Sequence, residues 1–175
     1  MAADVDDLLQ FLPNIALFGG LEESTLRRVI ALMKVQRPDK GEQVCKQGDN
    51  GKDMFIVRRG EVAVVRERES GRRVRMVRLG VGEFFGEMTL IDPQKRSATI
   101  VVEQPSVLLS LGSKDLYQLF QQDVNGYVMI LQNLCREMSR RLRTTNARLS
   151  QMAEEADEDN TLIGRPSVKR RNTLP

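Results

Sequence analysis

The stretch Phe85–Ile100 decides the fold, and it reads FGEMTLIDPQKRSATI. Within it an acid, Glu87, directly follows Gly86, and Arg96 comes after a short apolar segment, residues 88–91. Glycine lets the backbone approach a ligand with its N–H groups bared, and the first N–H groups of a helical turn attract anions. Arginine offers a fork of donors to phosphate oxygens, and a carboxylate accepts hydrogen bonds from sugar hydroxyls. The stretch predicts a site for a singly charged anion beside a sugar, built on a buried turn of helix.

This pattern resembles the phosphate-binding cassette of cyclic nucleotide-binding domains, which occur in catabolite activators, protein kinase A regulatory subunits and cyclic-nucleotide-gated channels. The family pattern is F-G-E, a variable turn, then R-[SAT]-A, and this chain matches it over FGE and RSA. The resemblance implies that five residues hold the cyclic phosphate: Gly86, Met88, Arg96, Ser97 and Ala98. It also implies that Glu87 binds the ribose 2′-hydroxyl. Thr89 departs from the family, where Ala or Gly is commoner, and it could perturb the turn.

Composition narrows the class of protein. The 175 residues suit one domain with some length left for arms or a tail, and the chain holds 29% charged residues and a net charge of +3. No apolar run approaches the ~20 residues of a membrane span, and the N-terminus is acidic, so we expect a cytoplasmic protein without a membrane segment. Cys45 and Cys135 are expected to be free thiols. The chain has no histidine, which removes the commonest general base and metal ligand. We therefore expect no enzyme activity, no metal and no cofactor.

The order of patterns predicts an α+β fold. Residues 1–34 form a helical prelude, with apolar positions at helical spacing in Val5–Leu12 and Glu22–Met33. Residues 35–112 read as short strands, including 54–57 and 62–65, separated by glycine turns such as Arg59–Gly60. Such strands are typical of a closed or jelly-roll β-barrel, the fold that the resemblance also implies, with the phosphate-binding cassette at 82–98. The apolar bed for the base is expected from three residues of this barrel: Val74, Met76 and Phe85.

Residues 113–153 are predicted to be helical and to end in a long helix. One set of positions alternates steps of four and three, as in a heptad seam: Leu131, Cys135, Met138, Leu142, Thr145, Leu149 and Met152. This spacing favours a homodimer, the alternative being a helix that folds back on its own barrel. The helix also resembles the dimer helix of the activator family, which implies that Thr145 and Asn146 reach the adenine.

The tail, residues 154–175, is acidic, then broken by Gly164 and Pro166, then basic, which predicts disorder. Arg170–Thr173 resembles the kinase pattern R-R-x-[ST], so Thr173 is a candidate phosphorylation site, although such tetrapeptides arise often by chance. The tail is too short for a helix-turn-helix domain, so a nucleic-acid partner is not expected.

We therefore interpret the chain as a stand-alone cyclic nucleotide sensor that favours cAMP over cGMP. Its long helix would report occupancy to a dimer mate or to an unknown protein partner. Two alternatives remain: an interaction scaffold that works without nucleotide, and a transcriptional regulator that lacks its own helix-turn-helix.

Overall fold

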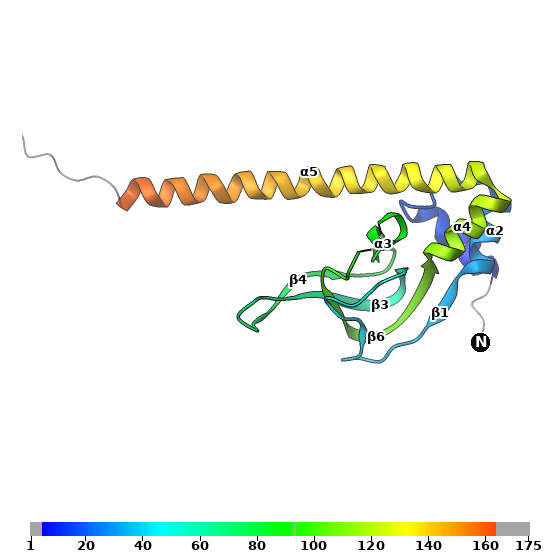
Figure 1. Ribbon diagram of the computed structural model, residues 1–175, viewed down its shortest axis with the longest axis horizontal. Helices are drawn as coiled ribbons and strands as arrows, with labels where there is room; N and C mark the ends of the chain where they lie inside the picture. Colours follow the sequence, from blue (N-terminus) through cyan, green and yellow to red (C-terminus); the bar gives the residue numbers. More distant parts are fainter. Residues whose placement is uncertain (1–4, 93, 164–175) are drawn as a thin grey trace, which may run out of the picture. The chain divides into compact units, whose positions relative to one another are not determined.

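The structure is a computed structural model that describes residues 5–92 and 94–163, with side chains described as far as residue 155 (Figure 1). Its elements follow the chain in this order: α1 (Val5–Phe11), the 3-10 helix η1 (Leu12–Asn14), α2 (Glu23–Leu32), β1 (Lys34–Gln36), β2 (Gln43–Cys45), β3 (Asp53–Glu67), β4 (Arg73–Leu79), β5 (Phe84–Phe85), α3 (Met88–Ile91), β6 (Thr99–Gly112), α4 (Ser113–Gln122) and α5 (Val124–Ile163). The chain divides into two compact units, the first ending at Cys135 and the second beginning at Arg136. Helix α5 runs through both.

The first unit is built on one antiparallel sheet with the strand order β1-β6-β3-β4, in which β2 also pairs with β6 and β5 with β3. The expected α+β fold, a jelly-roll sheet with N-terminal helices and a long C-terminal helix, is confirmed. The sheet is not closed into a barrel, because β1 and β4 end the order and do not pair with each other. Each of these two strands has one neighbour, so the sheet keeps two edges.

The predicted turn at Arg59–Gly60 is also wrong. Segments 54–57 and 62–65 belong to a single strand, β3, whose register with β6 shifts repeatedly between Val57 and Val62. Gly60 has a φ of +87°, and a Cβ there would lie 2.7 Å from the carbonyl oxygen of Pro105 and would overlap the side chain of Ser106. The glycine therefore bends a continuous strand by allowing a bulge against β6.

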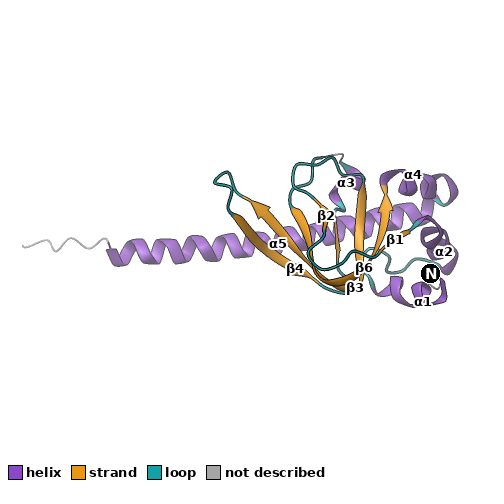
Figure 2. Cartoon of the chain, turned by 90° about the horizontal axis from the view of Figure 1, so that it is seen from below, coloured by secondary structure: helices purple, strands orange, loops and turns teal. Residues whose placement is uncertain are grey.

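Two apolar clusters hold the first unit together. Helices α1, α2 and α4 gather at one end of the sheet (Figure 2) and pack with Met54, Ile56 and the α5 residues Ile130 and Leu134. A second cluster fills the interior of the bent sheet: Phe55, Val57, Val62, Leu79, Phe85, Ile100, Val102 and Leu108. The candidate site described below lies beside this second cluster.

The beginning of α5 is fixed to the first unit. The amide of Asn133 donates hydrogen bonds to the carbonyl oxygens of Leu17 at 3.2 Å and Gly19 at 2.9 Å. Buried side-chain amides that satisfy loop carbonyls in this way specify one packing arrangement.

Helix α5 continues to Ile163, past the predicted boundary at residue 153. Neither proline nor glycine interrupts the sequence between the predicted boundary and Gly164, which is compatible with a helix of this length, and the disorder of the tail stays a prediction. Residues 164–175, including the candidate phosphorylation site Thr173, lie outside the described residues. None of the helices within the described part has the length and apolar character needed to cross a bilayer.

Candidate functional site

The site begins at Gly86, where β5 leaves the sheet. Gly86 has a φ of +76°, a conformation that glycine adopts without strain. A Cβ at this position would lie 3.0 Å from the carbonyl oxygen of Asp53 and would overlap Nη1 of Arg96. Both the backbone conformation and the space therefore require glycine. Helix α3 starts two residues later, at Met88.

Arg96 is the centre of the site, and its side chain is almost fully buried, at 8% exposed. Nη2 donates a hydrogen bond to the carbonyl oxygen of Asp53 at 2.7 Å. The Arg96 backbone donates to the carbonyl oxygen of Asp49 at 2.8 Å and accepts from the N–H of Gly48 at 2.9 Å. Gly51 lies so close to the guanidinium that a Cβ there would overlap it. The side chain is thus closely packed between two glycines, Gly51 and Gly86.

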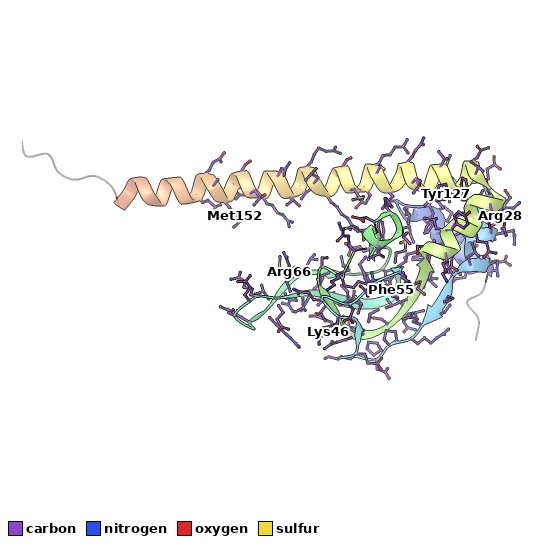
Figure 3. All side chains as sticks on the ribbon, in the orientation of Figure 1. Arg28, Lys46, Phe55, Arg66, Tyr127 and Met152 are labelled. Atoms are coloured by element: carbon purple, nitrogen blue, oxygen red, sulfur yellow. The ribbon has the colours of Figure 1, made fainter. Side chains whose placement is uncertain are left out.

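An aromatic stack supports this arginine. The rings of Phe55 and Phe85 stack with centroids 5.2 Å apart, and Cζ of Arg96 lies 5.7 Å from the centroid of Phe55, which Figure 3 labels on β3. Phe85, which was expected in the bed for the base, is 5% exposed and belongs to this stack. A cation within about 6 Å of a ring centroid gains modest electrostatic stabilisation. This contact with Phe55 does not use the N–H donors of the Arg96 guanidinium.

One nitrogen of Arg96 is left for a ligand. Within the described residues, Nη1 is buried and has no hydrogen-bond partner. Leaving a buried donor unpaired costs roughly 1–3 kcal/mol, and more for a charged group. Burial raises the pKa of the Cys45 thiol, although the positive charge of Arg96 acts in the opposite direction, so this thiol is neutral at pH 7 and supplies no anion. The geometry fits an anionic ligand that accepts a hydrogen bond from Nη1.

Glu87 and Thr89 shape the turn beside the arginine. Glu87 is 8% exposed and lies directly before α3, where its carbonyl oxygen accepts a hydrogen bond from the N–H of Leu90 at 3.1 Å. The Thr89 hydroxyl donates to the carbonyl oxygen of Gly86 at 2.7 Å. The sequence left open whether Thr89 perturbs the turn. In the structure its hydroxyl closes the turn.

The expected burial of the turn is only partly observed. Met88 and Ile91 are 51% and 52% exposed, whereas Leu90 packs against the core of the first unit. A single helical turn can bury only one side, and here that side carries the buried Thr89 and the partly buried Leu90. On the other side of the arginine, Ser97 is exposed and Ala98 is half-buried.

The other two residues expected to contact the base, Val74 and Met76, line a pocket of about 640 Å³ at the β3–β4 hairpin, together with Gln47, Arg66 and other hairpin residues. Val74 is half-buried and Met76 is 58% exposed. Arg66 was not singled out from the sequence, because one arginine among many in the hairpin carries no local signal.

Thr145 and Asn146 lie in the second unit, on α5. Both are exposed, and the hydroxyl of Thr145 donates to the carbonyl oxygen of Arg141 at 2.9 Å within the helix. Their contact with the base stays a prediction.

The predicted heptad positions form an exposed apolar line, which we call the α5 seam. Four of its large residues are 37–65% exposed: Met138, Leu142, Leu149 and Met152. Cys135 is exposed and Thr145 is too, whereas Leu131 is partly buried against the core of the first unit. Val124 and Val128, 52% and 43% exposed, continue the same spacing upstream. The sequence missed them because a break was expected at Asn125–Gly126, but the helix begins before these residues.

Within the described residues, no group of three or more His, Cys, Asp or Glu side chains is placed to hold a metal ion.

Comparisons with known proteins point to one family. The family model for the cyclic nucleotide-binding domain matches residues 35–123, about half of the chain. Cyclic AMP receptor protein of Thermus thermophilus is 30% identical over 139 residues, which are 79% of this chain and 62% of that protein. Mouse cGMP-dependent protein kinase 2 is 28% identical over 134 residues, which are 72% of this chain but only 18% of the kinase.

A solved structure of a cyclic nucleotide-binding domain also resembles this chain. The crystal structure of a cyclic nucleotide-binding domain from Methylobacillus flagellatus aligns with a TM-score of 0.75 and 25% identity over 85% of this chain and 83% of that one. The chain therefore spans a small part of the kinase, most of the bacterial domain and somewhat under two thirds of the receptor protein.

Proposed function

Because this chain belongs to the cyclic nucleotide-binding domain family, we propose that it is a sensor that binds a cyclic nucleotide, cAMP in preference to cGMP. The observation that carries the proposal is the buried and unpaired Nη1 of Arg96. A cyclic phosphate bears one negative charge and has exocyclic oxygens that accept hydrogen bonds, so it supplies what this nitrogen lacks.

The remaining contacts are proposed from the resemblance of residues 85–98 to the phosphate-binding cassette of the family. Gly86 and Met88 offer backbone N–H groups to the phosphate, and Ser97 and Ala98 border it on the far side of the arginine. Glu87 is buried next to the turn and accepts a hydrogen bond from the ribose 2′-hydroxyl. The clamped guanidinium needs little reorganisation when the ligand binds, which favours affinity.

Base preference rests on the second unit and is a separate step of the proposal. The resemblance of the long helix to the dimer helix of the activator family implies that Thr145 and Asn146 reach the adenine, and this resemblance favours cAMP. The names of the relatives do not decide the question, since one is named for cyclic AMP and another for cGMP.

Signal output is proposed to pass through the α5 seam. With Val124 and Val128 included, its spacing covers four heptads, a length at which coiled-coil pairing is expected to be stable. We therefore propose a homodimer through the seam, whose equilibrium the ligand shifts. The same exposed seam also favours the alternative of a scaffold that works without nucleotide.

Calorimetric titration tests the proposal. Nucleotide-free protein is titrated with cAMP and with cGMP, alongside the Arg96→Ala variant and the control Arg27→Ala, an exposed helix residue paired with Glu23. We expect binding at one ligand per chain, tighter for cAMP, and a loss of about 3–5 kcal/mol in Arg96→Ala only, because the phosphate then lacks its charge partner. Absence of binding to the unaltered protein would leave the scaffold as the better function.

A further inference from the structure

The pocket at the β3–β4 hairpin is lined by an arginine, Arg66, that is not among the residues proposed to bind the phosphate. Arg66 pairs with Val74 across the β3–β4 ladder, so the two side chains lie on the same face of the sheet. Both line the pocket of about 640 Å³, together with Met76. Figure 3 shows Arg66 on β3, the strand that also carries Phe55 beneath Arg96. The pocket thus places two apolar side chains, Val74 and Met76, beside the cationic donor of Arg66. Its remaining lining residues are polar or charged: Gln47, Glu67, Arg68, Glu69 and Ser70.

The end of the strand that carries Arg66 is tied to the phosphate site. The side chain of Gln47 donates to the carbonyl oxygen of Glu67 at 3.3 Å and accepts from its N–H at 2.9 Å. The next residue, Gly48, donates to the carbonyl oxygen of Arg96 at 2.9 Å. Two adjacent residues, Gln47 and Gly48, therefore connect the end of β3 to the backbone of Arg96.

Arg66 differs from the other arginines of the ladder in its contacts. Arg73 pairs with Glu67, Arg75 with Glu103, and Arg78 with Glu103 and Glu61. In the part of the chain that the structure describes, Arg66 makes no ion pair. Arg68 also lines the pocket, but it belongs to the turn that follows β3 rather than to the strand.

The chemistry of the base decides what such a donor can recognise. A guanidinium has donors only, so it must face an acceptor of the base. N7 is an acceptor that adenine and guanine share and that pyrimidines lack. The purine ring is flat and apolar on its faces, which suits contact with the aliphatic side chains of Val74 and Met76.

Resting on the proposed function, we infer that Arg66 donates a hydrogen bond to N7 of the purine while Val74 and Met76 contact the ring. Arg66 thereby makes the site specific for purine cyclic nucleotides. Because adenine and guanine share N7, this contact is compatible with the preference for cAMP proposed for the second unit.

Calorimetry with cAMP and its 7-deaza analogue, in which a carbon replaces N7, tests the inference on the full chain. Arg66→Met keeps the length of the side chain and removes the donors. Arg72→Met, an exposed hairpin residue outside the pocket lining, removes the same charge as a control. We expect the unaltered protein and Arg72→Met to bind cAMP about tenfold more tightly than the analogue. In Arg66→Met we expect cAMP affinity to fall about tenfold and the difference between the two ligands to vanish.

Three other calorimetric results would overturn the inference about Arg66. If Arg66→Met keeps the preference for cAMP over the analogue, the contact with N7 is wrong while Arg96-dependent binding leaves the proposed function intact. If both ligands weaken equally in Arg66→Met and the preference persists, the arginine acts only through its charge and the inference is again overturned. If neither ligand binds the unaltered protein, the inference falls together with the proposed function. Unchanged unfolding temperatures of the two variants exclude a folding defect as the cause.

Discussion

Arg96 and the arginines of β4 are the same residue type in opposite environments. Arg96 is 8% exposed, and the described residues give it no carboxylate partner. Arg73, Arg75 and Arg78 are more than half exposed, and each forms an ion pair. Exposed ion pairs contribute little to stability, whereas an uncompensated buried charge is costly unless something binds it. The difference separates a buried arginine that lacks a counter-ion among the described residues from surface arginines that already have one.

The largest expected effect comes from filling the space that Arg96 occupies. Gly86→Ala forces a side chain into a backbone conformation with φ of +76° and overlaps the guanidinium. We expect a loss of about 3–5 kcal/mol in unfolding free energy, from backbone strain and overpacking together, and a loss of measurable cAMP binding. Denaturant unfolding and calorimetry measure the two quantities.

Gly71→Ala is the matched control for this prediction. Gly71 has nearly the same φ, +75°, but nothing lies within 4 Å of a Cβ there. Its substitution should cost only the backbone strain, about 1–2 kcal/mol, and should leave binding unchanged. Equal losses in the two variants would show that the approach of Arg96 to Gly86 has no role.

The second prediction concerns the stability of ligand-free protein. Arg96→Met removes the buried charge and one hydrogen bond, to Asp53, so the two effects oppose each other. We expect the unfolding free energy without ligand to change by less than about 1 kcal/mol, while stabilisation by cAMP is lost. A loss of about 3–5 kcal/mol without ligand would instead indicate that Arg96 is half of a structural ion pair.

These comparisons also show what the sequence could reveal. Gly86, Glu87 and Arg96 could be proposed as site residues from the sequence because they lie within one local pattern with a specific chemistry. Gly51 and Asp53, which clamp and hydrogen-bond the guanidinium, were missed because only folding brings them to Arg96.

The turn expected at Gly60 and the closure of the sheet also depend on contacts between residues that are far apart in the sequence. Gly60 signals a positive φ, but whether this makes a turn or a bulge depends on β6, a strand far away in the sequence. Closure of the sheet likewise depends on whether β1 and β4 meet, and periodicity within either strand contains no information about this.

The third prediction tests the turn itself. Thr89→Val keeps the shape of the side chain but removes the hydroxyl that donates to Gly86 at 2.7 Å. We expect a cost of about 1 kcal/mol in stability, and a fall of about fivefold in cAMP affinity because the turn loosens. Thr144→Val is the control, because that hydroxyl donates to Arg140 on an exposed helix face. Thermal unfolding and calorimetry should separate the two, and an equal response would remove Thr89 from the site.

The smallest effect is expected for the exposed arginines of β4. Glu103→Gln breaks the ion pairs with Arg75 at 3.1 Å and Arg78 at 2.8 Å, both at exposed arginines. We expect a loss below about 1 kcal/mol at 0.1 M salt that disappears at 1 M, where screening acts over about 3 Å. cAMP affinity should not change at either concentration. A loss of affinity that persists at high salt would mean that the charges of β4 reach the ligand, and the contrast between a buried arginine kept for binding and surface arginines would then no longer hold.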